Sequence, residues 1–325
     1  MNLKIDEKFV FKNFNMITEL DIAGEFIYDG IHTLNQMHSI EETALLFSFL
    51  YHISVGIERM QKIIIVLFED IPKEQQEEFE KSLITHSHVA LATRIAKLTN
   101  KKLDSRENEF LQVLSNFYKS VRYDRFNMGY AFSKEQKMIR DYVEKNVIAE
   151  KIQYHFITNE IIISDNVKEF LGKVIRKISG FYYNLIKEGS DKNNTYTSEL
   201  RSASKAEKVF GVSEDEKSLQ EQKIKEGIAL KELLIYLRNT KEKNSFVRFL
   251  DEIEPLELDV ELLNEYIEEL SKGIVSQNLI DEVEYLYEEK GDIKRRIDIL
   301  HVVGNTNVLF DMSDIDDEDQ IDEAK

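Results

Sequence analysis

The sequence predicts an all-α protein, a helical bundle built around one long central helix. Only two prolines and twelve glycines occur among the 325 residues, which is few for a turn-rich sheet architecture. Glu, Lys, Leu and Ile are abundant, and helices accept all four. Apolar residues also recur at helical spacing in successive segments along the chain. We therefore expect a helix in nearly every segment that is rich in apolar residues.

The predicted central helix runs from Glu41 to Asp70. Its first half is apolar on nearly every side and its second half is amphipathic, so it needs neighbouring helices on several sides. Ser39 and Glu42 form the S-x-x-E pattern of a capping box at its start. Gly56 in its middle predicts a close crossing with another helix.

The central stretch is long enough to cross a bilayer, but its charges argue against a membrane segment. Glu58, Arg59 and Lys62 lie across its middle, and each charge costs a few kcal/mol in hydrocarbon. The first residues lack the uninterrupted apolar segment of a secretory signal. The absence of cysteine is compatible with a reducing compartment. We expect a cytoplasmic protein with no membrane partner.

The apolar pattern first defines an N-terminal strap and a helical domain. Residues 1–20 alternate enough to form a short strand, or they form a strap on the helical body. Residues 21–188 show helical spacing in successive segments, beginning with a first helix at Asp21, and predict one helical domain. Within it, residues 159–164 are predicted to be an extended connector.

Polar and acidic stretches define the rest of the chain. Residues 189–221 are polar, Ser-rich and poor in large apolar side chains, which predicts a linker or mobile insertion, or a partly helical exposed loop. Residues 222–310 return to amphipathic segments and predict a second helical block. Residues 311–325 are strongly acidic and predict a disordered tail.

Composition and motifs exclude several classes of chemistry. The formal net charge of -18 repels phosphate backbones, so a nucleic-acid contact would need a local basic cleft. Without cysteine there are no thiolate nucleophiles and no cysteine-based zinc sites. The sequence also lacks the P-loop, Rossmann, zincin and α/β-hydrolase motifs. His86 and His88 are two apart, which does not match the spacing of a helical metal pair. We expect neither a metal nor a cofactor.

Four helical segments between residues 21 and 127 carry short motifs in a particular order. The second segment contains GIERMQKIIIVL, the third opens with HSHVALATRI, and the fourth carries Tyr118, Arg122 and Tyr123 as Y-x-x-x-R-Y. This block resembles the HEPN domain, an all-α bundle of prokaryotic conflict proteins, nucleotidyltransferase-linked proteins and several ribonucleases. The resemblance implies a binding module for RNA, a nucleotide or a protein partner in a bacterial defence or stress system.

The resemblance also implies a ligand-binding cluster of histidine, arginine and tyrosine side chains. Arginine forks and aromatic faces suit a nucleotide or an unstacked RNA base. The residues that we expect to bind the ligand are His86, His88, Arg122, Tyr123 and Arg125. In the alternative interpretation, Tyr118 and Tyr123 belong to the core, and Arg122 pairs with a buried acid such as Glu58.

Active HEPN ribonucleases carry an Arg-x4-6-His motif, usually completed by dimerisation, and cleave RNA without metal. Here neither Arg122 nor Arg125 is followed by a histidine within that reach, but Arg296 and His301 match the motif far downstream. They predict the catalytic pair of a metal-independent endoribonuclease that acts as a homodimer. A simpler alternative is a helix C-terminus, where basic side chains compensate exposed carbonyls. A third alternative is a non-catalytic helical scaffold.

Overall fold

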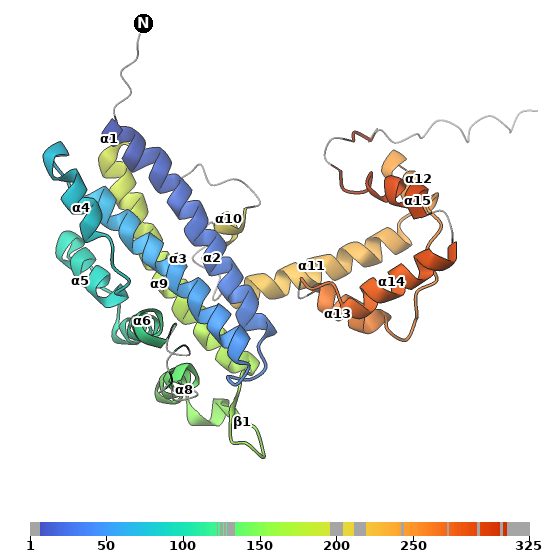
Figure 1. Ribbon diagram of the computed structural model, residues 1–325, viewed down its shortest axis with the longest axis horizontal. Coiled ribbons are helices and arrows are strands. Elements are labelled where there is room, and N and C mark those ends of the chain that lie inside the picture. The colour runs from blue at the N-terminus through green and yellow to red at the C-terminus, as the bar shows by residue number, and fades with distance from the viewer. Residues whose placement is uncertain are drawn as a thin grey trace, which may run out of the picture. The chain divides into compact units, whose positions relative to one another are not determined.

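The computed structural model of the chain is all-α, as predicted (Figure 1). It describes residues 7–121, 123, 126, 128, 134–195, 204–210, 219–241, 244–271, 273–290, 293–305 and 308–310. Among these residues, the only sheet is a two-stranded hairpin. The chain divides into two compact units, Met1–Ile224 and Lys225–Lys325, and each is described by itself.

The first rod of the N-terminal unit begins earlier than the sequence indicates. Helix α1 (Glu7–Val10), a π-helical turn η1 (Phe11–Asn15) and helix α2 (Met16–Gln36) follow one another without a break. The described part of the predicted strap is therefore helical, and its strand alternative is wrong. The reason is Lys12, a buried residue whose Nζ donates to the carbonyl oxygens of Leu67 (3.3 Å) and Glu69 (3.1 Å). The strap thereby donates hydrogen bonds to free carbonyl groups at the end of the central helix, and it does not pair as a strand.

Helix α3 (Thr43–Phe68) is the central helix that the sequence predicts, and it buries side chains from Leu46 to Leu67. Helix α2 packs along its length, and α5 and α9 cover other sides (Figure 1). At Gly56 a Cβ atom would lie only 2.9 Å from the carbonyl oxygen of Ala23 on α2. The predicted close crossing is confirmed.

The predicted capping box at the start of α3 is only half formed. The Glu42 carboxylate accepts hydrogen bonds from the backbone N–H groups of His38 and Ser39, the latter at 3.0 Å. The Ser39 hydroxyl, however, accepts from the N–H of Glu41 (3.1 Å). This happens because the helix starts at Thr43, one residue after Glu42, so the serine lies too far ahead to cap it.

Short helices cover one side of α3, and one of them continues into a second π-helical turn. In chain order they are η2 (Lys73–Gln75), α4 (Gln76–Ser82), α5 (His88–Thr99), α6 (Ser105–Asn116), η3 (Phe117–Val121), α8 (Lys134–Asn146) and η4 (Ala149–Lys151). The π-helical turn is η3, which continues α6 directly. Helix α5 ends at Asn100, which adopts the left-handed conformation (φ 55°).

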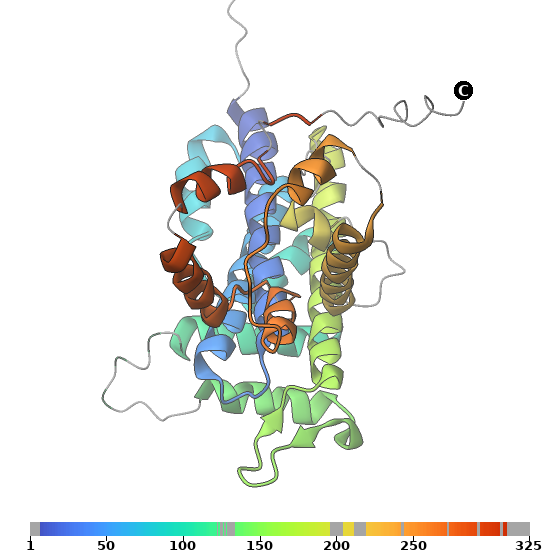
Figure 2. The ribbon, with the colours of Figure 1, turned by 90° about the vertical axis from the view of Figure 1, so that its right-hand side faces the viewer.

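The predicted extended connector is one strand of a hairpin. Strands β1 (Gln153–Tyr154) and β2 (Ile161–Ile162) pair antiparallel, with Tyr154 opposite Ile161. A bridge between Ser39 and Ile162 attaches the hairpin beside the N-terminal end of α3. The hairpin projects from the end of the unit (Figure 2).

The region predicted as a linker from residue 189 contains packed helix. Helix α9 (Asp165–Asn193) continues through Gly189, where a Cβ atom would lie 2.8 Å from the Phe68 ring. Helix α10 (Lys205–Phe210) packs on α2, with Ala206 against Gly24. The linker prediction is wrong for these parts because small residues and a few apolar side chains are enough to dock them.

The second unit is helical, as the sequence predicts for residues 222–310. Its helices are α11 (Leu219–Asn239, which begins before the boundary), α12 (Ser245–Asp251), α13 (Leu263–Ser271), α14 (Gln277–Lys290) and α15 (Ile293–Leu300). The predicted acidic tail, residues 311–325, lies outside the described residues. No helix in the described part of the chain combines the length and the apolar character needed for a bilayer span.

Candidate functional site

Three segments that are distant in the sequence meet at His86. His86 lies in the loop that precedes α5, and its Nδ1 atom is 3.0 Å from Glu58 Oε2 on α3. The imidazole ring centroid is 4.7 Å from that of Tyr118 in η3. About half of the His86 side chain is exposed. We call Glu58, Lys62, His86 and Tyr118 the His86 site.

Glu58 fixes the orientation of the His86 imidazole. The carboxylate is buried, and it accepts a hydrogen bond from Lys62 Nζ (2.7 Å), one helical turn further along α3. A buried carboxylate needs such partners because it has lost its hydration. Since a carboxylate can only accept, the neutral imidazole carries its hydrogen on Nδ1, and Nε2 is an acceptor.

Aromatic rings continue from His86 into the bundle. Tyr118 stacks on Tyr51 (ring centroids 6.1 Å apart, planes 16° apart), and Tyr51 stacks on Phe47 (6.3 Å, 7°). Tyr118 is buried, so His86 is the outer ring of this row and the one that a ligand can reach. Tyr118 belongs to a π-helical turn, and such turns occur frequently at functional sites.

Two lysines lie close enough to act on the neighbouring His88. Lys62 and Lys119 lower the pKa of His88, and Glu58 opposes them. Lys62 is itself paired with Glu58.

His88 is buried next to the His86 site, so a ligand cannot reach its side chain. It is fully buried, and its Nδ1 atom is 3.2 Å from Gln61 Oε1. The amide nitrogen of Gln61 donates to the Tyr182 hydroxyl (2.8 Å) and to the carbonyl of His88 (3.0 Å). Burial lowers the pKa of His88 to about 4. The expectation that His88 binds ligand is wrong, because this network holds it inside the bundle.

The remaining residues of the predicted cluster are placed only in part. Tyr123 is exposed. Arg122 and Arg125 lie outside the described residues, so their role stays a prediction. Tyr118 is buried, as the alternative interpretation expects, but Glu58 pairs with Lys62 and His86.

The predicted catalytic pair lies in the second unit. Arg296 Nη1 donates to the carbonyl oxygen of Glu254 (2.8 Å). His301 follows the last residue of α15, and its N–H donates to the carbonyl of Ile297 (2.9 Å). Within the part of the chain that the structure describes, no hydrogen bond or ion pair joins Arg296 to His301. Their catalytic role remains a prediction.

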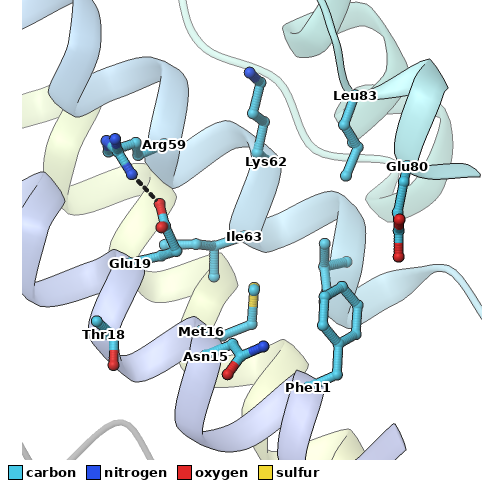
Figure 3. A pocket seen from close by; sticks show the side chains of 11 residues that line it. Phe11, Asn15, Met16, Thr18, Glu19, Arg59, Lys62, Ile63, Glu80 and Leu83 are labelled. Atoms are coloured by element: carbon cyan, nitrogen blue, oxygen red, sulfur yellow. Dashed lines mark hydrogen bonds and ion pairs between the residues drawn. The ribbon is translucent and has the colours of Figure 1, made fainter.

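A hollow lined in part by Lys62 was not predicted from the sequence. It has a volume of about 520 Å³ and lies between α2, α3 and the end of α4 (Figure 3). Its lining is mostly apolar, with charged side chains at its rim: Phe11, Asn15, Met16, Thr18, Glu19, Arg59, Lys62, Ile63, Val66, Glu80 and Leu83. We call it the α2–α3 groove.

In comparisons with known proteins, no family model, no curated protein and no solved structure matches this chain. The resemblance to the HEPN domain therefore rests on the sequence motifs alone. Among the described residues, no group of three or more His, Asp or Glu side chains could hold a metal ion.

Proposed function

We propose that the N-terminal unit binds a nucleotide unit, either free or within single-stranded RNA, at the His86 site. The observation that carries this proposal is the half-exposed His86 ring, held at Nδ1 by the buried Glu58. A base would stack on the outer face of the imidazole. The phosphate would lie toward Lys62 and Lys119, two lysines whose charges act on the neighbouring His88.

Three physical properties support this choice of ligand. Histidine is one of the aromatic side chains on which unpaired bases stack. Such stacking contributes about 1–3 kcal/mol per base. Glu58 and Tyr118 fix the ring from two sides, so little side-chain freedom is lost on binding. Lys62 and Lys119 place two cations near the site in a chain whose formal net charge is -18.

Replacing His86 with alanine is expected to weaken binding about tenfold or more, because the stacking surface is lost. The measurement is fluorescence anisotropy with a labelled single-stranded oligouridylate, together with calorimetry using uridine monophosphate, both in EDTA. The two ligands distinguish an RNA site from a site for free nucleotide. The matched control is His301→Ala, the same replacement in the second unit, which should leave binding unchanged. Equal affinity of wild type and His86→Ala for both ligands would exclude the proposal.

The same samples test the endoribonuclease alternative, which nothing in the described residues supports. Unlabelled total RNA is incubated with each protein in EDTA, and its length is followed on a gel. We expect wild type and His301→Ala to leave the RNA intact. Metal-free cleavage by wild type that disappears in His301→Ala would establish the alternative instead. A pure scaffold would bind neither oligouridylate nor nucleotide.

A further inference from the structure

The α2–α3 groove has the size and the apolar lining of a site for a small molecule. Its volume of about 520 Å³ falls within the range of about 300–1,000 Å³ that is usual for ligand sites. Figure 3 shows the side chains of Phe11, Met16 and Ile63 gathered in it. Methionine adapts its side chain to ligands of different shape. A hydrocarbon chain would gain free energy by leaving water for this part of the groove.

The first rod contributes a π-helical turn to the groove. Phe11 and Asn15, the first and last residues of η1, both line it. Such turns are rare and occur frequently at functional sites. Asn15 directly precedes α2 and is exposed, but its side chain caps no backbone N–H group of that helix. Its amide therefore offers a donor and an acceptor to a ligand in the groove.

The charges around the groove favour an uncharged ligand. Arg59 pairs with Glu19, and Lys62 Nζ donates to Glu58 Oε1 (2.7 Å). A carboxylate ligand would compete with these two acids, and the formal net charge of -18 would also repel it. An ammonium ligand would bring a further cation beside Arg59 and Lys62, which is unfavourable. Glu80, the remaining charged residue of the lining, is exposed and keeps its hydration.

Arg59 and Lys62 can still donate hydrogen bonds to an uncharged acceptor. A guanidinium has five N–H groups and an ammonium has three. Among the described residues, Arg59 donates only to Glu19, and Lys62 donates only to Glu58. The Arg59 Nε atom is buried and has no acceptor among them. A carbonyl oxygen of the ligand can accept from these side chains without displacing either acid.

We propose that the α2–α3 groove binds an uncharged acyl ester or amide, a molecule with a hydrocarbon chain and a carbonyl group. The chain lies against Met16 and Ile63, and the carbonyl oxygen accepts a hydrogen bond from Arg59 or Lys62. The Asn15 amide bonds a hydroxyl or amide group next to the carbonyl. Lys62 is the only residue that this groove shares with the His86 site, so the proposal does not depend on nucleotide binding.

Three related ligands test the chemical class on the wild-type protein by calorimetry. Monodecanoylglycerol, used below its micelle-forming concentration, is the ester. Decanoate has the same acyl chain with a carboxylate, and monodecylglycerol ether lacks only the carbonyl oxygen of the ester. We expect both to bind about tenfold or more weakly than the ester, because one is repelled and the other loses a hydrogen bond to a cation. Failure of the ester to bind, or equal affinity of the ester and either relative, would overturn the proposal.

Variants test whether the ester binds in the groove. Asn15→Trp and Thr18→Trp each place a large ring at an exposed lining position and should weaken binding of the ester about tenfold or more. Phe14→Trp, exposed on the same rod but outside the lining, is the matched control and should bind like wild type. His86→Ala should also bind like wild type, which separates the groove from the His86 site.

All four changes are at exposed positions, so circular dichroism should give melting temperatures close to that of wild type. The ester should raise the melting temperature of wild type and of Phe14→Trp, because a ligand that binds the folded chain stabilises it. It should raise those of the two groove variants less. An equal increase in wild type and in both groove variants would place the ester elsewhere and overturn the proposal.

Discussion

Replacing Gly56 with alanine is expected to lower the free energy of unfolding of the N-terminal unit by about 2 kcal/mol. The new Cβ would lie 2.6 Å from Ile27 Cγ1 and 2.9 Å from the carbonyl oxygen of Ala23. Ile27 is fully buried and the carbonyl belongs to the backbone of α2, so neither can move aside cheaply. Overpacking of this kind costs about 1–3 kcal/mol, which exceeds the roughly 1 kcal/mol that alanine gains over glycine inside a helix. Urea denaturation followed by circular dichroism measures the change.

Gly180 provides the matched control for the Gly56 prediction. It lies inside helix α9, where, among the described residues, only Arg176 Nη1 comes within 4 Å of an added Cβ, at 3.9 Å. Alanine at Gly180 should therefore raise the free energy of unfolding by about 0.5–1 kcal/mol, through helix propensity alone. If both replacements stabilise the protein, α2 and α3 do not approach each other as closely as the structure indicates.

The close crossing at Gly56 was predictable from the sequence. Glycine destabilises a helix, so its presence inside a strongly apolar helix indicates a position where a larger side chain would not fit. The central helix was predictable for a related reason, since its apolar pattern is local and long. The beginning of the first helix was not, because its cause is Lys12. A lysine in the sequence normally indicates a solvent-exposed side chain. Only the carbonyl groups of Leu67 and Glu69, which are distant in the sequence, make its burial favourable.

The His86 site was predictable only in part. The spacing of Glu58 and Lys62 on one helix face is visible in the sequence, as is the presence of two histidines before α5. Which histidine faces solvent depends on the direction in which the loop enters α5, and that is set by tertiary packing on α3. The pairing of Glu58 with His86 could not be predicted either, because the two residues are 28 positions apart in the chain. The α2–α3 groove also needed the structure, since it combines segments that are distant in sequence.

Acidification is expected to destabilise the N-terminal unit through His88. Burial lowers the pKa of the folded imidazole to about 4, compared with 6.5 for an unperturbed histidine. Above pH 6.5 the folded and unfolded chains both carry neutral His88. As the pH falls from 6.5 to 4, the unfolded chain binds a proton that the folded chain does not bind, so stability decreases with decreasing pH. At about 1.4 kcal/mol per pH unit, the loss attributable to His88 approaches about 3 kcal/mol at pH 4.

The charges around His88 support the sign of this effect. Desolvation is the largest cause of the lowered pKa; Glu58 opposes it, and His86, Lys62 and Lys119 add to it. Protonation would place a cation beside the Gln61 amide in a site where Nε2 has no hydrogen-bond partner among the residues that the structure describes. A buried charge without a partner is strongly disfavoured, so the folded state resists the proton until the bundle opens.

A comparison of His88→Gln with wild type isolates this contribution from other groups that titrate in acid. Glutamine keeps a hydrogen-bond donor near Gln61 but does not titrate. The free energy of unfolding of the His88→Gln protein should therefore fall less steeply between pH 6.5 and 4 than that of wild type. Across that range, the difference between the two free energies of unfolding should change by about 3 kcal/mol in favour of the variant. The control is His301→Gln, the same replacement at an exposed histidine of the second unit, which leaves the network around His88 intact. Parallel curves for wild type and His88→Gln would mean that His88 reaches solvent in the folded protein, and the orientation of His86 above it would then need another explanation.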